Sequence, residues 1–338
     1  MPSGWRGWRA GNHEHADGVP FRYAAGCSPG LKVRLVLPLL RTFAIGLSIC
    51  LFSPLARAEG DTLVLGRISD DPKAHYEQLK PLLDYVVPRM KDVGISQGRI
   101  LMARNDRQMA SYLRSGRVDW VTETPASGVM LRARASAVPL LRSDRGGSAQ
   151  YTSVIFVRKD STVRNLADLR GRSIAFQSPA STSAYIVPAY EMLLKGLHFE
   201  VQITPSDRPD GTAVGYLFAR TERNIATWVV KGLVDAGAVS DLDWRDPARM
   251  PASYRAQLRT LHVSAGFPRA MELVSAKMPA RVRDRLQQVL VDARSDPAAR
   301  KALAAFFGTT GFEPIDAHTR RELDYLESAV MRVSREVE

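Results

Sequence analysis

Cysteine is scarce in this chain of 338 residues. Its two cysteines, Cys27 and Cys50, both precede residue 59, so the remainder of the chain has no thiol nucleophile, no disulfide and no cysteine-based metal site. The sequence also lacks a P-loop and a His-Glu-x-x-His motif, and its histidines after residue 58 are scattered without metal-ligand spacing. A Gly-x-Ser-x-Gly match at residues 26–30 does not follow a strand, as the hydrolase motif requires. We therefore expect no enzyme active site, no catalytic residue, no metal and no cofactor.

Long hydrophobic runs are missing as well. The apolar run at residues 42–52 is too short to span a bilayer. Lys32, Arg34 and Arg41 precede this run, and an Ala-x-Ala motif that ends at Ala58 follows it. A basic segment, an apolar segment and a small-residue cleavage site in this order are typical of a secretory signal peptide. We predict cleavage after Ala58 and export to the periplasm; an uncleaved membrane anchor is the alternative.

The leader, residues 1–58, begins with a stretch that is long for a signal peptide, and we expect the true start codon to lie downstream of Met1. Removal of the leader takes away seven basic and two acidic residues, which lowers the formal net charge from +12 to +7. The basic residues that remain are not interleaved with aromatic ones, so we expect a solvated basic surface and no nucleic-acid partner.

Strand and helix signals alternate after the leader, which is typical of an α/β protein. Strands are predicted at residues 62–66, 99–103 and 118–121, with an amphipathic helix from Asp71 onward between the first two. The third strand leads into a turn that contains Glu123 and Thr124. Ligands of open α/β sheets lie beyond the carboxyl ends of the strands, so this turn is a candidate wall of a ligand site.

The stretch at residues 151–197 contains a second candidate wall. Strands are predicted at residues 151–157 and 173–176, and the second strand leads through Gln-Ser-Pro-Ala-Ser-Thr-Ser into a helix. A helix start leaves several backbone N–H groups without an intrahelical partner, and the helix dipole adds positive potential there. With three hydroxyls at residues 181–183, this turn is a natural binding site for an oxyanion.

The segments YTSVIFVRKDS, LADLRG, SIAF and SPASTSAYIVP, in this order, resemble the periplasmic phosphate/phosphite/phosphonate-binding proteins of ABC importers, the PhnD-like family. The resemblance runs from about Leu63 to the C-terminus. It implies a type II periplasmic-binding-protein fold, in which two α/β lobes are joined by two crossover strands with a ligand cleft between them. We expect lobe 1 to comprise residues 59–155 and 260–338, and lobe 2 residues 156–259. The crossovers are expected near residues 151–157 and 258–263, and closure of the lobes would enclose the ligand.

In this family the STS-aromatic-x-VP element is the phosphonate-binding turn. The resemblance therefore implies that Ser181, Thr182 and Ser183 contact the ligand, with Ser178 in the same turn; a plain helix cap explains only one of these hydroxyls. Tyr151 stands where the family has a tyrosine that contacts the ligand. The alternative for Tyr151 is an aromatic residue that packs at the hinge.

The sequence departs from the family pattern at three places. Thr221-Glu222-Arg223-Asn224 replaces a group that contains the family's histidine, so Arg223 is a candidate bidentate donor to the oxyanion. Glu123 and Thr124 stand where small or aromatic residues are usual, and Asn105-Asp106-Arg107 replaces a tyrosine of the first lobe. Glu123, or Asp241 after the last strand of lobe 2, would pair with an amine on the ligand. An exposed arginine at a helix start and ordinary loop acids are the alternatives.

Three functions are compatible with these patterns. The first is a periplasmic solute-binding protein, a monomer, that captures a small oxyanion of the phosphonate, phosphite or phosphate type for an inner-membrane ABC permease. The second is a periplasmic sensor that signals through the same cleft to a membrane kinase or cyclase. The third, a secreted hydrolase, requires a catalytic dyad that the sequence does not contain.

Overall fold

The computed structural model describes residues 61–337, which all belong to one compact unit, Ala56–Glu338. The predictions on the signal peptide, its cleavage after Ala58, the start codon and both cysteines lie outside the described residues. Within residues 61–337, no helix has the length and apolar character needed to cross a membrane.

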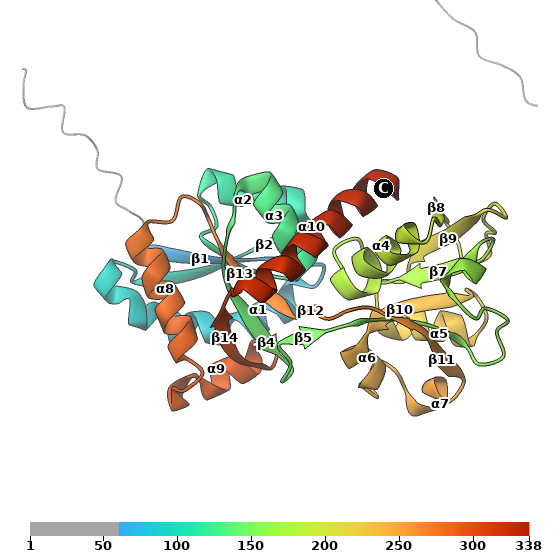
Figure 1. Cartoon of the computed structure of the whole chain (residues 1–338). Helices are drawn as coiled ribbons and strands as arrows, with labels where there is room; N and C mark the ends of the chain where they lie inside the picture. Colours follow the sequence, from blue (N-terminus) through green and yellow to red (C-terminus); the bar gives the residue numbers. More distant parts are fainter. Residues whose placement is uncertain (1–60, 338) are drawn as a thin grey trace, which may run out of the picture. The chain divides into compact units, whose positions relative to one another are not determined.

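The first sheet has six strands in the order β14-β4-β13-β3-β1-β2 (Figure 1). Its strands are β1 (Thr62–Ile68), β2 (Gln97–Ala103), β3 (Trp120–Glu123), β4 (Val138–Arg145), β13 (Ala270–Val274) and β14 (Thr309–Pro314). β1 pairs in parallel with β2 and β3, whereas β13 is antiparallel to β3 and β4. The three strands predicted for this region correspond to β1, β2 and β3. β4, β13 and β14 were not predicted, because their polar residues interrupt the apolar patterns on which strand prediction depends.

The second sheet also has six strands, in the order β11-β6-β10-β7-β9-β8. Its strands are β6 (Ser153–Arg158), β7 (Ser173–Phe176), β8 (His198–Val201), β9 (Ala213–Phe218), β10 (Ala236–Ser240) and β11 (Leu258–Val263). β7 lies between β10 and β9 and is parallel to both. Its central position buries all four of its residues, as the apolar SIAF run predicts.

Helices cover both sheets, and most of them begin at a residue whose side chain caps the helix. The first sheet is accompanied by α1 (Pro72–Val86), η1 (Val87–Val93), α2 (Asp106–Ser115), α3 (Pro125–Ala135), α8 (Ala280–Asp292), η4 (Pro297–Ala299) and α9 (Arg300–Ala305). The second is accompanied by η2 (Leu166–Leu169), η3 (Thr182–Ile186), α4 (Val187–Leu194), α5 (Glu222–Val230), α6 (Asp241–Arg245) and α7 (Ala252–Arg255). Asp71, Asn105 and Thr124, for example, accept a backbone hydrogen bond at the starts of α1, α2 and α3.

Two short strands join the segments that run between the sheets. β5 (Gln150–Tyr151) pairs with β12 (Phe267–Pro268), and Figure 1 shows both between the two sheets. The rings of Tyr151 and Phe267 meet edge to face with centroids 4.5 Å apart. The predicted crossover segments continue as β6 and β11, which both belong to the second sheet. The division of the chain at residues 155/156 and 259/260 stays a prediction.

The last helix, α10 (Ala317–Glu336), contacts elements of both lobes. It packs against α3 of the first lobe and against α4 of the second, where the rings of Tyr325 and Tyr190 lie 5.4 Å apart. Arg332 of α10 donates to the carbonyl of Leu193 at 3.4 Å. The apolar face of α10 is buried through Leu323, Leu326, Val330 and Val333. This helix therefore helps to hold the two lobes in their observed arrangement.

Candidate functional site

The hydroxyl-rich turn, residues 181–183, is here called the STS turn. It follows β7 and opens a continuous helical segment made of η3, which is a turn of π-helix, and α4. Ser181 is the N-cap, and its Oγ accepts a hydrogen bond from the N–H of Ala184 at 3.1 Å. Pro188 is the second residue of α4 and directly follows the turn of π-helix, so its missing N–H lies where the two helical segments join. The turn is thus built by a cap, a proline and a buried strand, all of which are local signals.

Two backbone N–H groups of the STS turn have no acceptor. Among the residues that the structure describes, the amides of Thr182 and Ser183 donate to no other group, whereas the amide of Ser181 donates to the carbonyl of Ser178. These are the orphan donors that a helix start always leaves, and the dipole of the helical segment places positive potential on them. This arrangement favours an anion.

The N-terminus of α3 lies against the STS turn. The N–H of Ala126 donates to the Oγ1 of Thr182 at 3.0 Å, and the Oγ1 of Thr124 donates to the carbonyl of Ala180 at 3.2 Å. Thr182 is consequently only 1% exposed. The first lobe therefore contacts the STS turn directly in this structure.

Tyr151 lies at the STS turn, as its predicted role requires. Tyr151 is buried, and its phenol interacts with the side chains of Thr182 and Ser183. Burial, which is the largest effect, raises the pKa of the Tyr151 phenol, whereas Arg269 and the two hydroxyls lower it. The phenol therefore stays protonated at neutral pH and is available as a donor.

We expect Tyr151→Phe to weaken oxyanion binding by about fivefold, because one neutral hydrogen bond contributes about 1 kcal/mol. Calorimetric titration measures the affinity, and urea denaturation measures the accompanying change in stability. Tyr112→Phe is the matched control, since the Tyr112 hydroxyl bonds only Gln108 on the same helix in the part of the chain described. Equal oxyanion affinities of Tyr151→Phe and Tyr112→Phe would show that the Tyr151 hydroxyl does not contact the ligand.

Glu123 is buried at the end of β3, and protein groups use both of its carboxylate oxygens. One oxygen accepts from the N–H of Ile68 at 2.6 Å; the other accepts from the N–H of Thr124 at 3.3 Å and lies 3.5 Å from Arg67. Thr124 caps α3 and contacts Ala180, so it joins the two lobes. Of the two residues, Thr124 reaches the STS turn, whereas Glu123 holds the ends of β1 and β3 together.

Of the remaining predicted residues, Ser178 adjoins the STS turn, where its carbonyl accepts from the N–H of Ser181, whereas no contact among the described residues places Arg223 or Asp241 in the turn. Arg223 is exposed in the first turn of α5. Asp241 accepts from the N–H of Thr152 at 2.9 Å and pairs with Arg245 at 2.7 Å, which positions the segment next to Tyr151. Ser178 is half-buried beside Gln177. These three stay predictions for ligand contact without a geometric argument in their favour.

Arg269, which lies near Tyr151, and Glu222, which interacts with Arg269, were not predicted. The guanidinium carbon of Arg269 lies 4.7 Å from the centroid of the Tyr151 ring. Glu222, in the first turn of α5, has its pKa raised by burial and then by the charge of Asp243, whereas Arg249 and Arg269 lower it. Sequence patterns give no sign of Arg269, because its position depends on the pairing of β5 with β12.

A buried ionic group supports the edge of the first sheet from which α3 begins. Arg145 donates to the Oγ1 of Thr122, and its guanidinium lies 3.9 Å from the carboxylate of Glu272. Glu272 accepts from Trp120 and Thr122 at 2.8 Å each and from Ser143 at 3.0 Å. Burial lowers the pKa of Arg145 to about 9. This group fixes the strand ends that carry Glu123 and Thr124.

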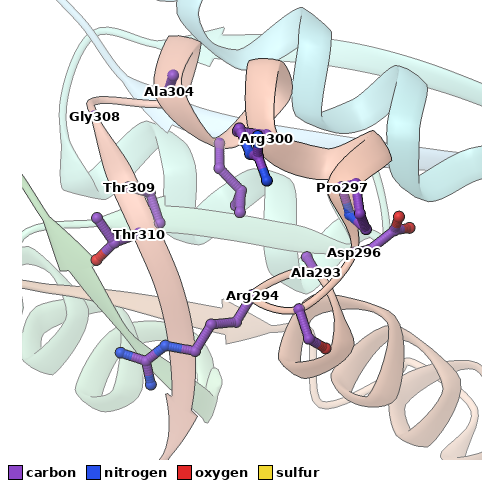
Figure 2. A pocket seen from close by; sticks show the side chains of 11 residues that line it. Ala293, Arg294, Asp296, Pro297, Arg300, Ala304, Gly308, Thr309 and Thr310 are labelled. Carbon is purple, nitrogen blue, oxygen red and sulfur yellow. The ribbon is translucent and has the colours of Figure 1, made fainter.

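The outer side of the first lobe carries a hollow of about 380 Å³ where α8, α9 and β14 meet (Figure 2). Its lining includes Arg294 and Asp296, which already have partners. Arg294 pairs with Glu313 at 2.7 Å and Asp144 at 3.2 Å, and Asp296 pairs with Arg89 at 3.0 Å. We assign this hollow no ligand. In the described part of the chain, no cluster of three or more histidine, aspartate or glutamate residues is arranged to hold a metal ion.

Comparisons with known proteins identify the family and the fold of this chain. A sequence model of the family described as "ABC transporter, phosphonate, periplasmic substrate-binding protein" matches residues 66–319. The phosphate-import protein PhnD of Mycolicibacterium smegmatis is 27% identical over 194 residues, which are 54% of this chain and 57% of that protein. The chain therefore aligns with little more than half the length of this relative.

Solved structures extend the comparison. XAC2383 from Xanthomonas citri bound to chloride is 48% identical with a TM-score of 0.80, and the same protein bound to ATP is 47% identical with a TM-score of 0.79; both comparisons cover 82% of this chain and 100% of that one. PhnD1 from Prochlorococcus marinus in complex with methylphosphonate has a TM-score of 0.61 at 16% identity, covering 81% of this chain and 99% of that one, which shows the fold alone. The predicted periplasmic-binding-protein fold is confirmed, and the chain belongs to the family of periplasmic phosphonate-binding proteins of ABC transporters.

Proposed function

We propose that this protein binds a small oxyanion of the phosphate, phosphite or phosphonate type at the STS turn and delivers it to an inner-membrane ABC permease. Membership of the family supports the role of substrate-binding component of an ABC transporter. The amides and hydroxyls of the STS turn support an oxyanion as the ligand. The protein acts as an exported monomer and breaks no bond of its ligand.

The observation that carries the proposal is the pair of amides of Thr182 and Ser183, which lack acceptors in the described structure although their side chains are buried. Buried amides without an acceptor are rare, because each costs about 1–3 kcal/mol. An oxyanion would accept from both amides and from the hydroxyls beside them. The first turn of α3 would then add a second positive helix end on the opposite side.

The contacts between the lobes support a mechanism of capture by closure. In an open form, the bonds Ala126–Thr182 and Thr124–Ala180 are broken and the STS turn is accessible to the anion. On closure, α3 returns over the turn, Tyr151 donates from the connecting strand, and water is excluded. Exclusion of water strengthens the charge-assisted hydrogen bonds to the anion. The closed form is the one that the permease would recognise.

Two relatives guide the choice of ligands for a test. The Xanthomonas protein is solved with ATP, which carries phosphate groups, and the Prochlorococcus protein with methylphosphonate. We expect phosphate, phosphite or methylphosphonate to raise the melting temperature of the purified protein, since a ligand that binds only the folded state stabilises it by about 2.7 kcal/mol at 100 times its Kd. Aminoethylphosphonate, ATP, sulfate and acetate complete the screen in a thermal-shift assay.

The control for this screen is sodium chloride at matched ionic strength, because salt alone also changes stability. A protein that responds to none of the phosphorus oxyanions would contradict the proposal. A response to ATP alone would indicate that the ligand is a larger molecule with a phosphate group that binds at the STS turn.

A further inference from the structure

The position of Arg269 is fixed by the strands that join the lobes. Its backbone N–H donates to the carbonyl of Ala149 at 3.0 Å, directly beyond the β5–β12 ladder. Its guanidinium lies on the ring of Tyr151, 4.7 Å from the ring centroid. The phenol of that same tyrosine interacts with the side chains of Thr182 and Ser183. The ring of Tyr151 therefore lies between the guanidinium of Arg269 and the side chains of the STS turn.

The charge of Arg269 is not matched by a partner. Within residues 61–337, its side chain forms no ion pair and no hydrogen bond, and its Nε is buried without an acceptor. A cation over the face of an aromatic ring is stabilised, but the ring does not replace the acceptors that five N–H groups require. The guanidinium of Arg269 can therefore bind an acceptor that the described residues do not provide.

The nearest acids are engaged elsewhere. Glu222 interacts electrostatically with Arg269, but it also lies 3.5 Å from Arg249. Arg249 pairs in addition with Asp243 at 2.7 Å and Asp246 at 3.5 Å. Arg145 also repels Arg269 electrostatically, although Glu272 offsets the charge of Arg145. Arg269 is therefore left without an ion-pair partner among the described residues.

We propose that Arg269 is the cationic ligand-binding residue of this chain, and that it makes the site selective for a doubly charged phosphonate or phosphate over a singly charged ester. This inference rests on the proposed function of the STS turn. The turn contributes neutral amides and hydroxyls to one side of the oxyanion, and the guanidinium binds an oxygen on the side that Tyr151 faces. A planar guanidinium bonds two oxygens of a phosphonate at once, which a lysine ammonium does not reproduce.

Charge selectivity is the property that distinguishes this role from a structural one. If Arg269 only supported the hinge, its replacement would weaken all ligands equally. If it binds the ligand, its replacement weakens a dianion more than a monoanion of similar shape. Methylphosphonate at pH 8.5 and its monomethyl ester are such a pair, since they differ by one methyl group and one charge.

The test is calorimetric titration of both ligands into the wild-type protein, Arg269→Gln, Arg269→Lys and Arg335→Gln. Arg335, whose side chain is 74% exposed on α10, is the matched control for loss of one positive charge. We expect Arg269→Gln to weaken methylphosphonate binding by about 10- to 100-fold and ester binding much less, because charge-assisted bonds are the stronger ones. Arg269→Lys should recover part of the preference, and Arg335→Gln should match the wild type.

Three outcomes separate this inference from the proposed function. An Arg269→Gln protein that keeps the wild-type preference for methylphosphonate overturns the inference and leaves the STS site intact. Equal weakening of both ligands also overturns it, since that result indicates support of the hinge. A wild-type protein that binds neither ligand rejects the proposed function itself, whatever Arg269 does.

Discussion

Replacement of both Thr182 and Ser183 by alanine is expected to weaken oxyanion binding by about 100-fold or more. Each charge-assisted hydrogen bond contributes roughly 1.5–3 kcal/mol, and two such donors are lost. Calorimetric titration with the oxyanion that gives the largest thermal shift measures this loss. The backbone amides remain in the double variant, so residual binding is expected rather than none.

The two single variants separate ligand contact from lobe closure. Thr182→Ala removes the acceptor of the Ala126 N–H as well as a ligand donor, whereas Ser183→Ala leaves that contact between the lobes in place. We therefore expect Thr182→Ala to change the rate of ligand release more than Ser183→Ala does, which stopped-flow measurement resolves. Ser328→Ala, which removes a hydroxyl on the surface of α10, is the control. Affinity that is unchanged in the double variant would count against the STS site.

Glu272→Ala is expected to destabilise the protein by roughly 3–5 kcal/mol, because removal of one partner of a buried ion pair leaves the other charge uncompensated. Glu272 is fully buried, and its carboxylate accepts from three side chains besides facing Arg145. The free energy of unfolding in urea measures the effect.

Two further variants serve as comparisons for the stability of Glu272→Ala. Glu272→Gln keeps the shape and an accepting oxygen, so it should lose less stability than Glu272→Ala. Glu336→Ala, at the end of α10, removes an acid whose ion pairs lie near the surface and should change stability by less than 1 kcal/mol. If Glu272→Ala unfolds at the same urea concentration as Glu336→Ala, Glu272 is not needed to balance Arg145.

Much of the second lobe could be read from local pattern. The SIAF strand, the cap at Ser181 and the proline in the first turn of α4 each act within a few residues, so the turn was predictable where the structure has it. The same holds for Tyr151, whose position next to Thr182 agrees with the role implied by the family resemblance. Arg223 and Asp241 were chosen for their charge and their place after strands of lobe 2, and neither property decides the direction of a side chain.

Local sequence patterns did not predict strands β4 and β13 of the first lobe. β4 and β13 carry buried Ser143, Arg145 and Glu272, which resemble loop residues in the sequence and are satisfied only by one another across the sheet. The apolar spacing of the residues in α10 gives no sign that this helix contacts both lobes. Satisfaction of buried polar groups by distant partners is invisible to a window of neighbouring residues.

By itself, the sequence determined the α/β alternation and the family, and it predicted an anion site at the STS turn, since apolar period, caps and hydroxyls act over short distances. Only the tertiary structure decided that α3 closes over this turn, that β5 pairs with β12, and that Arg269 consequently lies on Tyr151 without a counter-charge in the described chain. The reason is physical: these features depend on contacts between residues more than 50 positions apart, which are formed only when both lobes have folded.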